Sequence, residues 1–152
     1  MKVYRIVKEK YSEDLSGEGS RLFGGRWNKQ GSSVLYTASN SSLAMLEKLV
    51  HIQPFLFPRD IKMMHMELPK GASFETIVKE DLPDLWKDDQ YASYLTHLGE
   101  KFIAAQKSLG LIVPSVINEY DTNVILNVRH PAFAKVKILQ NTAVHFDERL
   151  LK

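Results

Sequence analysis

Residues 24–51 read GGRWNKQGSSVLYTASNSSLAMLEKLVH and contain three local patterns in direct succession. The paired glycines Gly24 and Gly25 allow a tight backbone turn. Residues 33–38, Ser-Val-Leu-Tyr-Thr-Ala, are predicted to form a strand. The cluster Ser39-Asn40-Ser41-Ser42 is typical of a helix N-terminus, and it precedes a helix predicted over about 41–51. Pro54 and Pro58 close that segment.

Outward from this stretch, strands and helices are mixed without strict βαβ alternation. Alternating or apolar runs predict further strands at 2–7, 61–68, 111–117, 123–127 and 135–139, with Pro114 marking an edge or a bulge. Apolar residues at spacings of three and four, including Tyr91, Tyr94 and Phe102 as core residues, predict the longest helix over 90–109, ended by Gly110. Segments 8–25 and 73–89 are predicted to be loops, the second with a short helical turn. The pattern favours a single α+β domain over residues 1–152.

Composition fits an ordinary globular domain, with 152 residues, 44% hydrophobic residues and 20 Lys and Arg against 18 Asp and Glu. The chain has no cysteine, which excludes thiolate catalysis, Cys-ligated zinc and iron–sulfur clusters. No apolar run reaches the roughly 18 residues of a membrane span, and the N-terminus lacks the apolar core of a secretory signal. We therefore expect a soluble cytoplasmic protein with no membrane contact.

Charge is unevenly distributed along the chain. Residues 1–30 carry 7 Lys and Arg against 4 Asp and Glu, whereas residues 75–100 carry 2 against 7. The net charge of +2 is too small to argue for direct nucleic-acid binding. The acidic stretch over 80–89 is expected to form a solvated surface loop, and a docking patch for a partner is the alternative.

Glu47 is the first candidate for chemistry. On a helical projection it lies between His51 and the edge of an apolar face, while Lys48 points away; that face comprises Leu43, Leu46, Leu49 and Val50. A partly buried carboxylate must be paired, hydrogen-bonded or functional. Periodicity alone favours the simpler interpretation, in which Glu47 is a boundary residue that reaches water or a loop amide.

Arg26 is the second candidate, because the neighbouring glycines allow close backbone approach and a guanidinium clamps phosphate or carboxylate with two parallel bonds. The same stretch also fits an ordinary loop held by Trp27. It contains neither a Rossmann fingerprint nor a Walker loop. The five histidines are scattered without metal-ligand spacing and are expected to be surface or satisfied residues, so no metal site is predicted. Ser115 alone is compatible with a plain strand residue.

Taken together, several motifs in order resemble the RES domain family. They are Gly24-Gly25-Arg26-Trp27-Asn28, Gly31, Val34 to Ala38, Ala44 to Glu47, Val113-Pro114-Ser115, Asn123 to Asn127, His130-Pro131 and Phe146 to Leu150. The resemblance spans nearly the whole chain. Val128 departs from it, standing where a proline commonly follows the asparagine, and Ile117-Asn118 lacks a proline often found after the serine.

The resemblance implies a fold related to ADP-ribosyltransferase toxins, with a mixed sheet core and flanking helices. It implies the toxin of a RES–Xre toxin–antitoxin pair, which depletes NAD by cleaving its nicotinamide–ribose bond. Glu47, Arg26 and Tyr36 then become catalytic candidates. Arg5, Ser115, Trp27 and Asn28 become substrate-binding candidates, whereas Asn123 and Asn127 are interpreted as residues that fix loop and strand.

In that mechanism Glu47 opposes positive charge on the ribose, Arg26 and Arg5 hold the pyrophosphate, Tyr36 contacts the nicotinamide end, and Ser115 orients the substrate. NAD is a substrate, so no cofactor is expected. Water, inorganic phosphate and a protein side chain stay open as acceptors, corresponding to a glycohydrolase, a phosphorylase and an ADP-ribosyltransferase. A non-enzymatic nucleotide-binding module is the alternative from another class. Expected partners are an Xre-type antitoxin and a second copy of the chain within such a complex.

Overall fold

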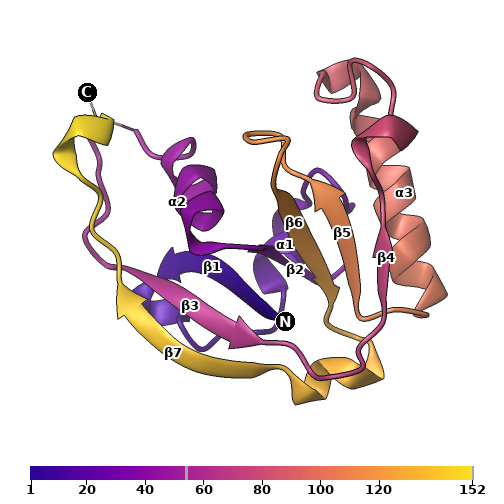
Figure 1. Ribbon diagram of the computed structural model, residues 1–152, viewed down its shortest axis with the longest axis horizontal. Coiled ribbons are helices and arrows are strands. Elements are labelled where there is room, and N and C mark those ends of the chain that lie inside the picture. The colour runs from indigo at the N-terminus through magenta and orange to yellow at the C-terminus, as the bar shows by residue number, and fades with distance from the viewer. Residues whose placement is uncertain (54, 152) are drawn as a thin grey trace.

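The computed structural model describes residues 1–53 and 55–151, and seven strands in it form one mixed sheet (Figure 1). The strands are β1 (Lys2–Lys8), β2 (Val34–Ala38), β3 (Ile61–Glu67), β4 (Phe74–Thr76), β5 (Gly110–Pro114), β6 (Thr122–Asn127) and β7 (Lys137–Ala143). The helices are α1 (Glu18–Phe23), α2 (Ser41–Leu49) and α3 (Ala92–Ala105). Short 3-10 turns cover Glu9–Tyr11, Lys79–Asp81, Asp89–Tyr91, Pro131–Lys135 and Glu148–Leu151.

The strand order is β4-β5-β6-β2-β1-β3-β7, with β4 and β5 parallel and every other neighbouring pair antiparallel. This confirms the α+β prediction with a mixed sheet and flanking helices. Within the described residues, no helix has the length and apolar character needed to cross a membrane.

The sheet divides between β1 and β2. These strands share one residue pair, Tyr4 with Ala38, whereas β1 pairs with β3 along seven residues and β2 pairs with β6 along five. The two halves, β7-β3-β1 and β2-β6-β5-β4, therefore diverge from a single point of contact. Buried residues from both halves, including Val3, Leu35 and Leu126, meet in one apolar cluster.

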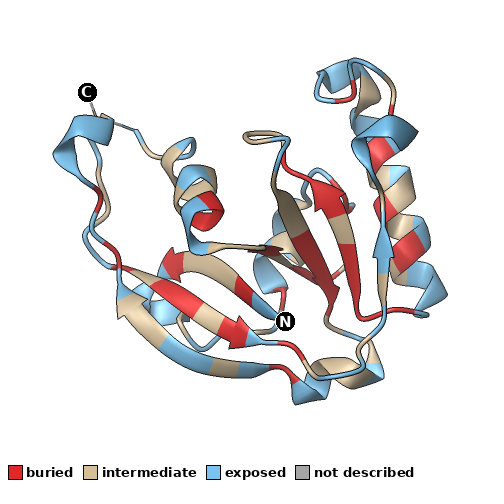
Figure 2. Cartoon of the chain, in the orientation of Figure 1, coloured by how far each residue is buried: buried red, intermediate tan, exposed pale blue. Residues whose placement is uncertain are grey.

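Both long helices lie over the same face of β2, because alternate residues of a strand point to one face. Val34 packs in the cluster that contains Phe102 of α3, and Ala38 packs in the cluster that contains Leu43 of α2. Tyr36 lies between them on β2. Figure 2 shows the buried residues concentrated on the inner strands and the sheet-facing side of α3, with β7 largely exposed. The space beside Tyr36 is thus flanked by two helices.

Several predicted elements need correction. The predicted loop over 8–25 contains α1, which buries no residue and so leaves no apolar periodicity to detect. The predicted loop over 73–89 contains β4, only three residues long. The longest helix ends at Ala105 rather than at 109, because Gln106 adopts a left-handed conformation (φ 49°) that stops it. Of its predicted core aromatics Phe102 is buried, Tyr91 is half-buried and Tyr94 is exposed.

Strand ends also differ from the prediction. The strand predicted over 111–117 ends at Pro114, so Ser115 begins the following turn. Pro114 lies in β5, which is an inner strand between β4 and β6. The pairing of β5 with β4 ends at Ile112, so the N–H that Pro114 lacks interrupts no hydrogen bond between these two strands. Residues 131–135 form a 3-10 turn and β7 runs on to Ala143. Pro54, which was predicted to help end the segment after α2, lies outside the described residues.

The acidic segment over 80–89 forms an exposed surface loop, as predicted. Its carboxylates are exposed, while Leu82 and Trp86 are buried in the cluster beneath α3. Glu119, in the turn between β5 and β6, accepts ion pairs from Lys79 at 2.9 Å and Lys87 at 3.6 Å. Two apolar anchors therefore hold this polar segment in place.

The contact between Gly99 of α3 and the backbone of Trp27 should tolerate no side chain. A Cβ at position 99 would lie 1.6 Å from the Trp27 carbonyl oxygen. Gly99→Ala should lower the free energy of unfolding by about 3 kcal/mol, the upper end of what overpacking costs. Gly19→Ala is the matched control, because it adds a Cβ to another helix with no atom within 4 Å. Equal stability of the two variants in urea unfolding would contradict this packing.

Candidate active site

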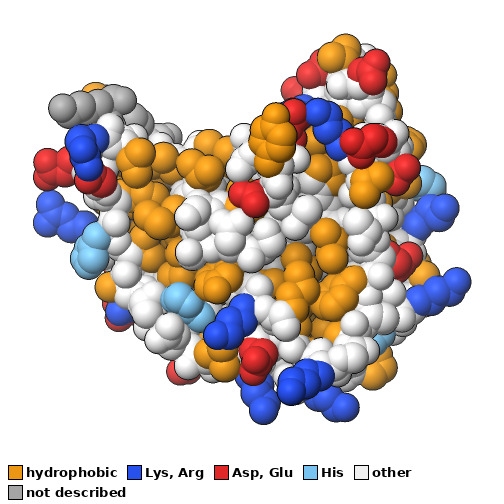
Figure 3. Space-filling view, viewed as in Figure 1, with side chains coloured by type: hydrophobic (Ala, Val, Ile, Leu, Met, Phe, Trp, Pro, Cys, Tyr) orange, Lys and Arg blue, Asp and Glu red, His pale blue; other side chains and the backbone are white. Residues whose placement is uncertain are grey.

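A cavity of about 760 Å³ opens beside Tyr36 on the face of β2 that both long helices flank. Its walls come from β1, α1 with the following loop, β2, α2 and the turn after β5. Figure 3 shows that the outline of the molecule dips between the end that carries α2 and the end that carries α3. Five of the seven predicted site residues line the cavity: Arg5, Arg26, Trp27, Tyr36 and Glu47.

One face of α2 forms a wall of this cavity. The lining residues Ala44, Glu47, Lys48 and His51 recur at helical spacing, and Asn40 caps the helix by accepting a hydrogen bond from the N–H of Leu43 at 2.8 Å. The prediction that Lys48 points away is wrong. The helical projection placed the buried face too far around the helix, since Leu46 and Val50 are exposed.

Glu47 is held by Ser115. The Ser115 hydroxyl donates to Glu47 Oε1 at 3.1 Å. Ser115 Oγ itself accepts from the N–H groups of Ile117 and Asn118 at 3.1 and 3.2 Å. Because two amides already donate to this oxygen, its own proton is directed to the carboxylate. Ser115 is 0% exposed and does not line the cavity, so it positions Glu47. The contact that Ser115 makes here is with Glu47, and its expected contact with a substrate stays a prediction.

Arg5 lies one residue beyond the point where β1 and β2 separate. Its Nη1 donates to the Tyr36 carbonyl at 2.8 Å, which satisfies an acceptor of β2 beside the divergence from β1. Burial lowers the pKa of the Arg5 guanidinium, and the Asp14 carboxylate opposes that shift. The side chain stays charged at neutral pH, so a partly buried cation faces the cavity.

Lys48 and Arg26 add two further cations. Burial lowers the pKa of Lys48, and the nearby charges of Lys8 and Arg5 lower it further. Arg26 is exposed and reaches the Lys87 carbonyl only at 3.4 Å, a long contact for a hydrogen bond. Cations at positions 5, 26 and 48 therefore surround a cavity in which Glu47 is the one lining carboxylate among the described residues.

The Tyr36 hydroxyl is engaged by the preceding loop. It donates to Asn28 Oδ1 at 2.6 Å and accepts from the Trp27 N–H at 3.1 Å. Burial raises the pKa of Tyr36 to about 12, opposed by the hydrogen bond from Trp27. Tyr36 is therefore a neutral phenol that lines the cavity and ties loop to strand.

Trp27 and Asn28 serve the scaffold. The Trp27 side chain, 3% exposed, packs in the apolar cluster with Trp86 at a ring separation of 6.5 Å. Asn28, 2% exposed, reaches the carbonyls of Ser20, Lys29 and Ser32 through Nδ2 at 3.0–3.1 Å. Trp27 lines the cavity and Asn28 does not, and the substrate-binding roles expected for these two residues stay predictions. Glu100 of α3 holds the same loop by accepting from the Lys29 N–H at 2.8 Å.

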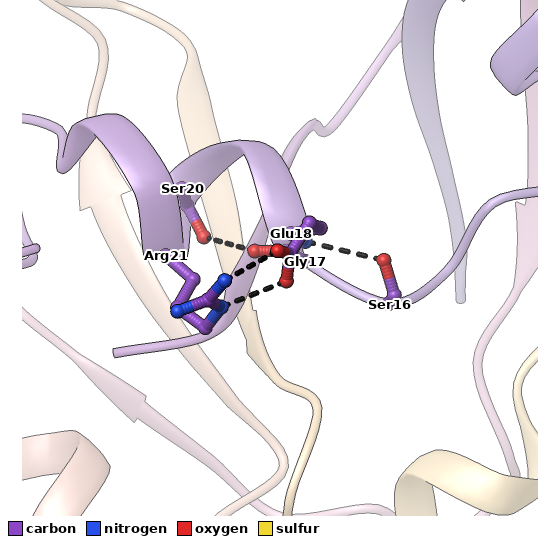
Figure 4. Close-up of polar contacts among 5 residues, drawn as sticks. All are labelled: Ser16, Gly17, Glu18, Ser20 and Arg21. Atoms are coloured by element: carbon purple, nitrogen blue, oxygen red, sulfur yellow. Dashed lines mark hydrogen bonds and ion pairs between the residues drawn. The ribbon is translucent and has the colours of Figure 1, made fainter. Parts of the chain in front are cut away.

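Helix α1 is fixed to the start of β2. Figure 4 shows the polar contacts within its first turn. Ser20 Oγ lies 2.9 Å from the Gly17 carbonyl and 2.7 Å from the Val34 carbonyl, and it accepts from the Val34 N–H at 2.9 Å. Ser16 Oγ accepts from the Glu18 N–H, and Arg21 Nε donates to Glu18 Oε2 at 2.8 Å. The short helix therefore forms a fixed wall of the cavity.

His51 is exposed, as expected for the histidines, and it also lines the cavity. Asn123 also lines it, while donating to the Thr37 carbonyl at 3.3 Å in the strand-fixing role predicted for it. In the described part of the chain, no three His, Asp or Glu side chains are grouped to hold a metal ion. Lys48 and His51 are thus the cavity-lining residues of this segment that the sequence analysis did not single out. A helical projection that places Ala44 and Glu47 on the cavity face would have included both.

The fold is that of a toxin from a toxin–antitoxin complex. The chain superimposes on a chain of the crystal structure of the Mycobacterium tuberculosis MbcT–MbcA toxin–antitoxin complex with a TM-score of 0.75, covering 94% of this chain and 83% of that one at 18% identity. At 18% identity, this structural similarity establishes the fold alone.

The chain belongs to the RES domain family, whose model matches residues 2–147. It is 34% identical to Toxin Res of Yersinia enterocolitica over 99% of both chains. It is 32% identical to Toxin Res of Photorhabdus laumondii, over 100% of this chain and 98% of that one. It is also 32% identical to the Prs ADP-ribosylating toxin of a Sphingobium species, over 93% and 89%. The resemblance seen in the motifs is confirmed.

The buried phenol of Tyr36 should make stability fall at high pH. Its folded pKa lies above the ordinary value of 10.0, so folding favours the protonated form; this contribution is complete below pH 10 and is lost as pH rises towards 12. Two pKa units correspond to about 2–3 kcal/mol. The unfolding free energy of the wild type should therefore fall by about 2–3 kcal/mol relative to that of Tyr36→Phe as the pH rises from 10 towards 12. A difference independent of pH in urea unfolding would contradict it.

Proposed function

We propose that this protein is an enzyme that cleaves the nicotinamide–ribose bond of NAD and acts as the toxin of a toxin–antitoxin pair. The observation that carries the proposal is a single oriented carboxylate, Glu47, in a cavity that also presents the cations Arg5, Arg26 and Lys48. NAD offers a matching pattern, because its pyrophosphate is anionic and its ribose becomes positively charged when nicotinamide leaves.

The cations suit the pyrophosphate. Arg5 is held by the Tyr36 carbonyl with further N–H groups of its guanidinium available to a ligand, and Lys48 of α2 lines the same cavity. Burial makes unneutralised charge costly at both positions, so an anion bound between them is favoured. Arg26 at the exposed rim supplies the planar fork that suits phosphate oxygens.

Glu47 suits the ribose. As the bond between ribose C1′ and the pyridinium nitrogen breaks, its electron pair leaves with nicotinamide, which departs neutral, and positive charge develops on the sugar. A carboxylate near C1′ stabilises that state, as carboxylates do in glycosidases. The acceptor oxygen then bonds to C1′ and loses its proton. Tyr36, as a neutral phenol, supplies an aromatic surface and no charge.

The acceptor is water, inorganic phosphate or a protein side chain, and one incubation separates these cases. Purified protein is mixed with NAD, with and without phosphate, and the products are followed by NMR. We expect nicotinamide release. ADP-ribose identifies a hydrolase, ADP-ribose 1″-phosphate identifies a phosphorylase, and release that requires added protein identifies a transferase. Tight NAD binding without nicotinamide release would instead support a non-enzymatic binding module.

A separately encoded antitoxin of Xre type is the proposed partner. An enzyme that destroys NAD would harm its own cell, so its cavity must be blocked until it is needed. The homologues named Toxin Res and the toxin–antitoxin structure support this assignment. A carboxylate or carbonyl of the partner placed against Arg5 or Arg26 would compete with the pyrophosphate for the same donors.

Glu47→Gln should keep the fold and NAD binding while lowering turnover 10²–10³-fold, roughly the effect of removing one electrostatic contact to the transition state. The amide keeps the shape of the side chain and loses its charge. Nicotinamide release by chromatography measures kcat, and binding titration measures Kd. Glu67→Gln, at an exposed position in β3, is the matched control. Unchanged turnover in Glu47→Gln would remove this residue from the mechanism.

Expression of the chain alone should lower cellular NAD and arrest growth, and co-expression with its antitoxin should restore both. The measurement is NAD content and growth rate after induction, with Glu47→Gln as the inactive comparison. Normal NAD content and growth, with verified folded protein present and no partner, would contradict the toxin assignment.

A further inference from the structure

Phe23 is an aromatic side chain left open at the mouth of the cavity. It is 80% exposed and lines the cavity, at the C-terminal end of α1 and three residues before Arg26. A phenyl ring in this position gains little from packing within the fold. Its neighbour Leu22 is also exposed but does not line the cavity. Phe23 thus presents a flat apolar surface to whatever occupies the rim.

The position of Phe23 is fixed by the backbone around it. Gly24 ends α1 with φ 69° and donates to the Ser20 carbonyl at 2.8 Å, which turns the chain sharply towards Arg26. At the other end of the helix, a Cβ at Gly17 would lie 2.9 Å from the Val34 carbonyl oxygen. With Ser20 bonded to both backbone groups of Val34, the helix cannot turn Phe23 away from the rim without breaking these contacts.

The elements that carry these groups suggest a ligand for Phe23. The proposed function places the nicotinamide ribose at Glu47 of α2. Phe23, the last residue of α1, and Arg26, in the loop that follows, are both exposed and line the same cavity. In NAD the pyrophosphate separates the two nucleosides, so a pyrophosphate held by the cations directs the adenosine towards Phe23.

We infer that Phe23 binds the adenine ring of NAD by stacking and so acts as a specificity residue for the adenosine half. This inference rests on the proposed function. Stacking on an aromatic side chain suits adenine, because every base presents a π-face and needs no hydrogen-bond donor from the protein. The contact is made equally before and during bond cleavage, so it affects KM and leaves kcat unchanged.

The test compares the two halves of the dinucleotide in Phe23→Ala. Titration calorimetry with AMP and with nicotinamide mononucleotide measures each half, and steady-state kinetics measures KM and kcat for NAD. We expect AMP affinity to fall and KM for NAD to rise on the order of tenfold, within the range that base stacking supplies. Affinity for nicotinamide mononucleotide and kcat should stay at wild-type values. Phe23→Trp should preserve AMP binding, and Leu22→Ala is the matched control.

Several results would overturn the inference. They are unchanged AMP affinity in Phe23→Ala, an equal loss for both mononucleotides, or a change of oligomeric state in light scattering, which would assign the ring to a protein contact. Absence of NAD cleavage by wild type would instead refute the proposed function. The AMP titration still decides the role of Phe23 in that case, because it requires no turnover.

Discussion

The single residue pair between β1 and β2 is the constraint on which the rest of the structure depends. Had the ladder continued past Tyr4 and Ala38, the sheet would be continuous and the Tyr36 carbonyl would face another backbone. Because the strands diverge, Arg5 supplies the donor, and a guanidinium enters the space between the two halves of the sheet. The same separation that opens the cavity therefore places a cation in it.

The loop between α1 and β2 contains both residues that stabilise the fold and a residue that faces the cavity. Trp27 and Asn28 are buried and hold the loop against α3, α1 and Tyr36, whereas Arg26 between Gly25 and Trp27 stays exposed at the rim. Buried Trp27 and Asn28 fix the backbone beside the exposed Arg26. An arginine on an unrestrained loop would lose backbone entropy as well as side-chain entropy on binding an anion. Residue identity alone does not separate the two roles.

The sequence predicted those parts of the fold that depend on periodicity over five or more residues. Strands β1, β2, β3 and β6 and helix α2 were found because alternation and capping are local signals. Helix α1 and strand β4 were missed because one buries nothing and the other is three residues long. In the site, Glu47 was found from its place on the helix, but the phase error that left Leu46 and Val50 in the apolar face hid Lys48. Burial of Trp27 and Ser115 depends on partners distant in sequence, Trp86 and Glu47, which no local pattern reveals.

The bond from Ser115 makes the two oxygens of Glu47 inequivalent. Oε1 accepts a hydrogen bond from the Ser115 hydroxyl, whose own oxygen accepts from two backbone amides in the turn after β5. Oε2 has no hydrogen-bond donor among the described residues, so it is the oxygen left open to other contacts. In the proposed function, the carboxylate therefore presents one unengaged oxygen to the ribose rather than a symmetric pair. Its orientation is set by Ser115, which does not line the cavity, so a site with a single carboxylate still has a defined direction of approach.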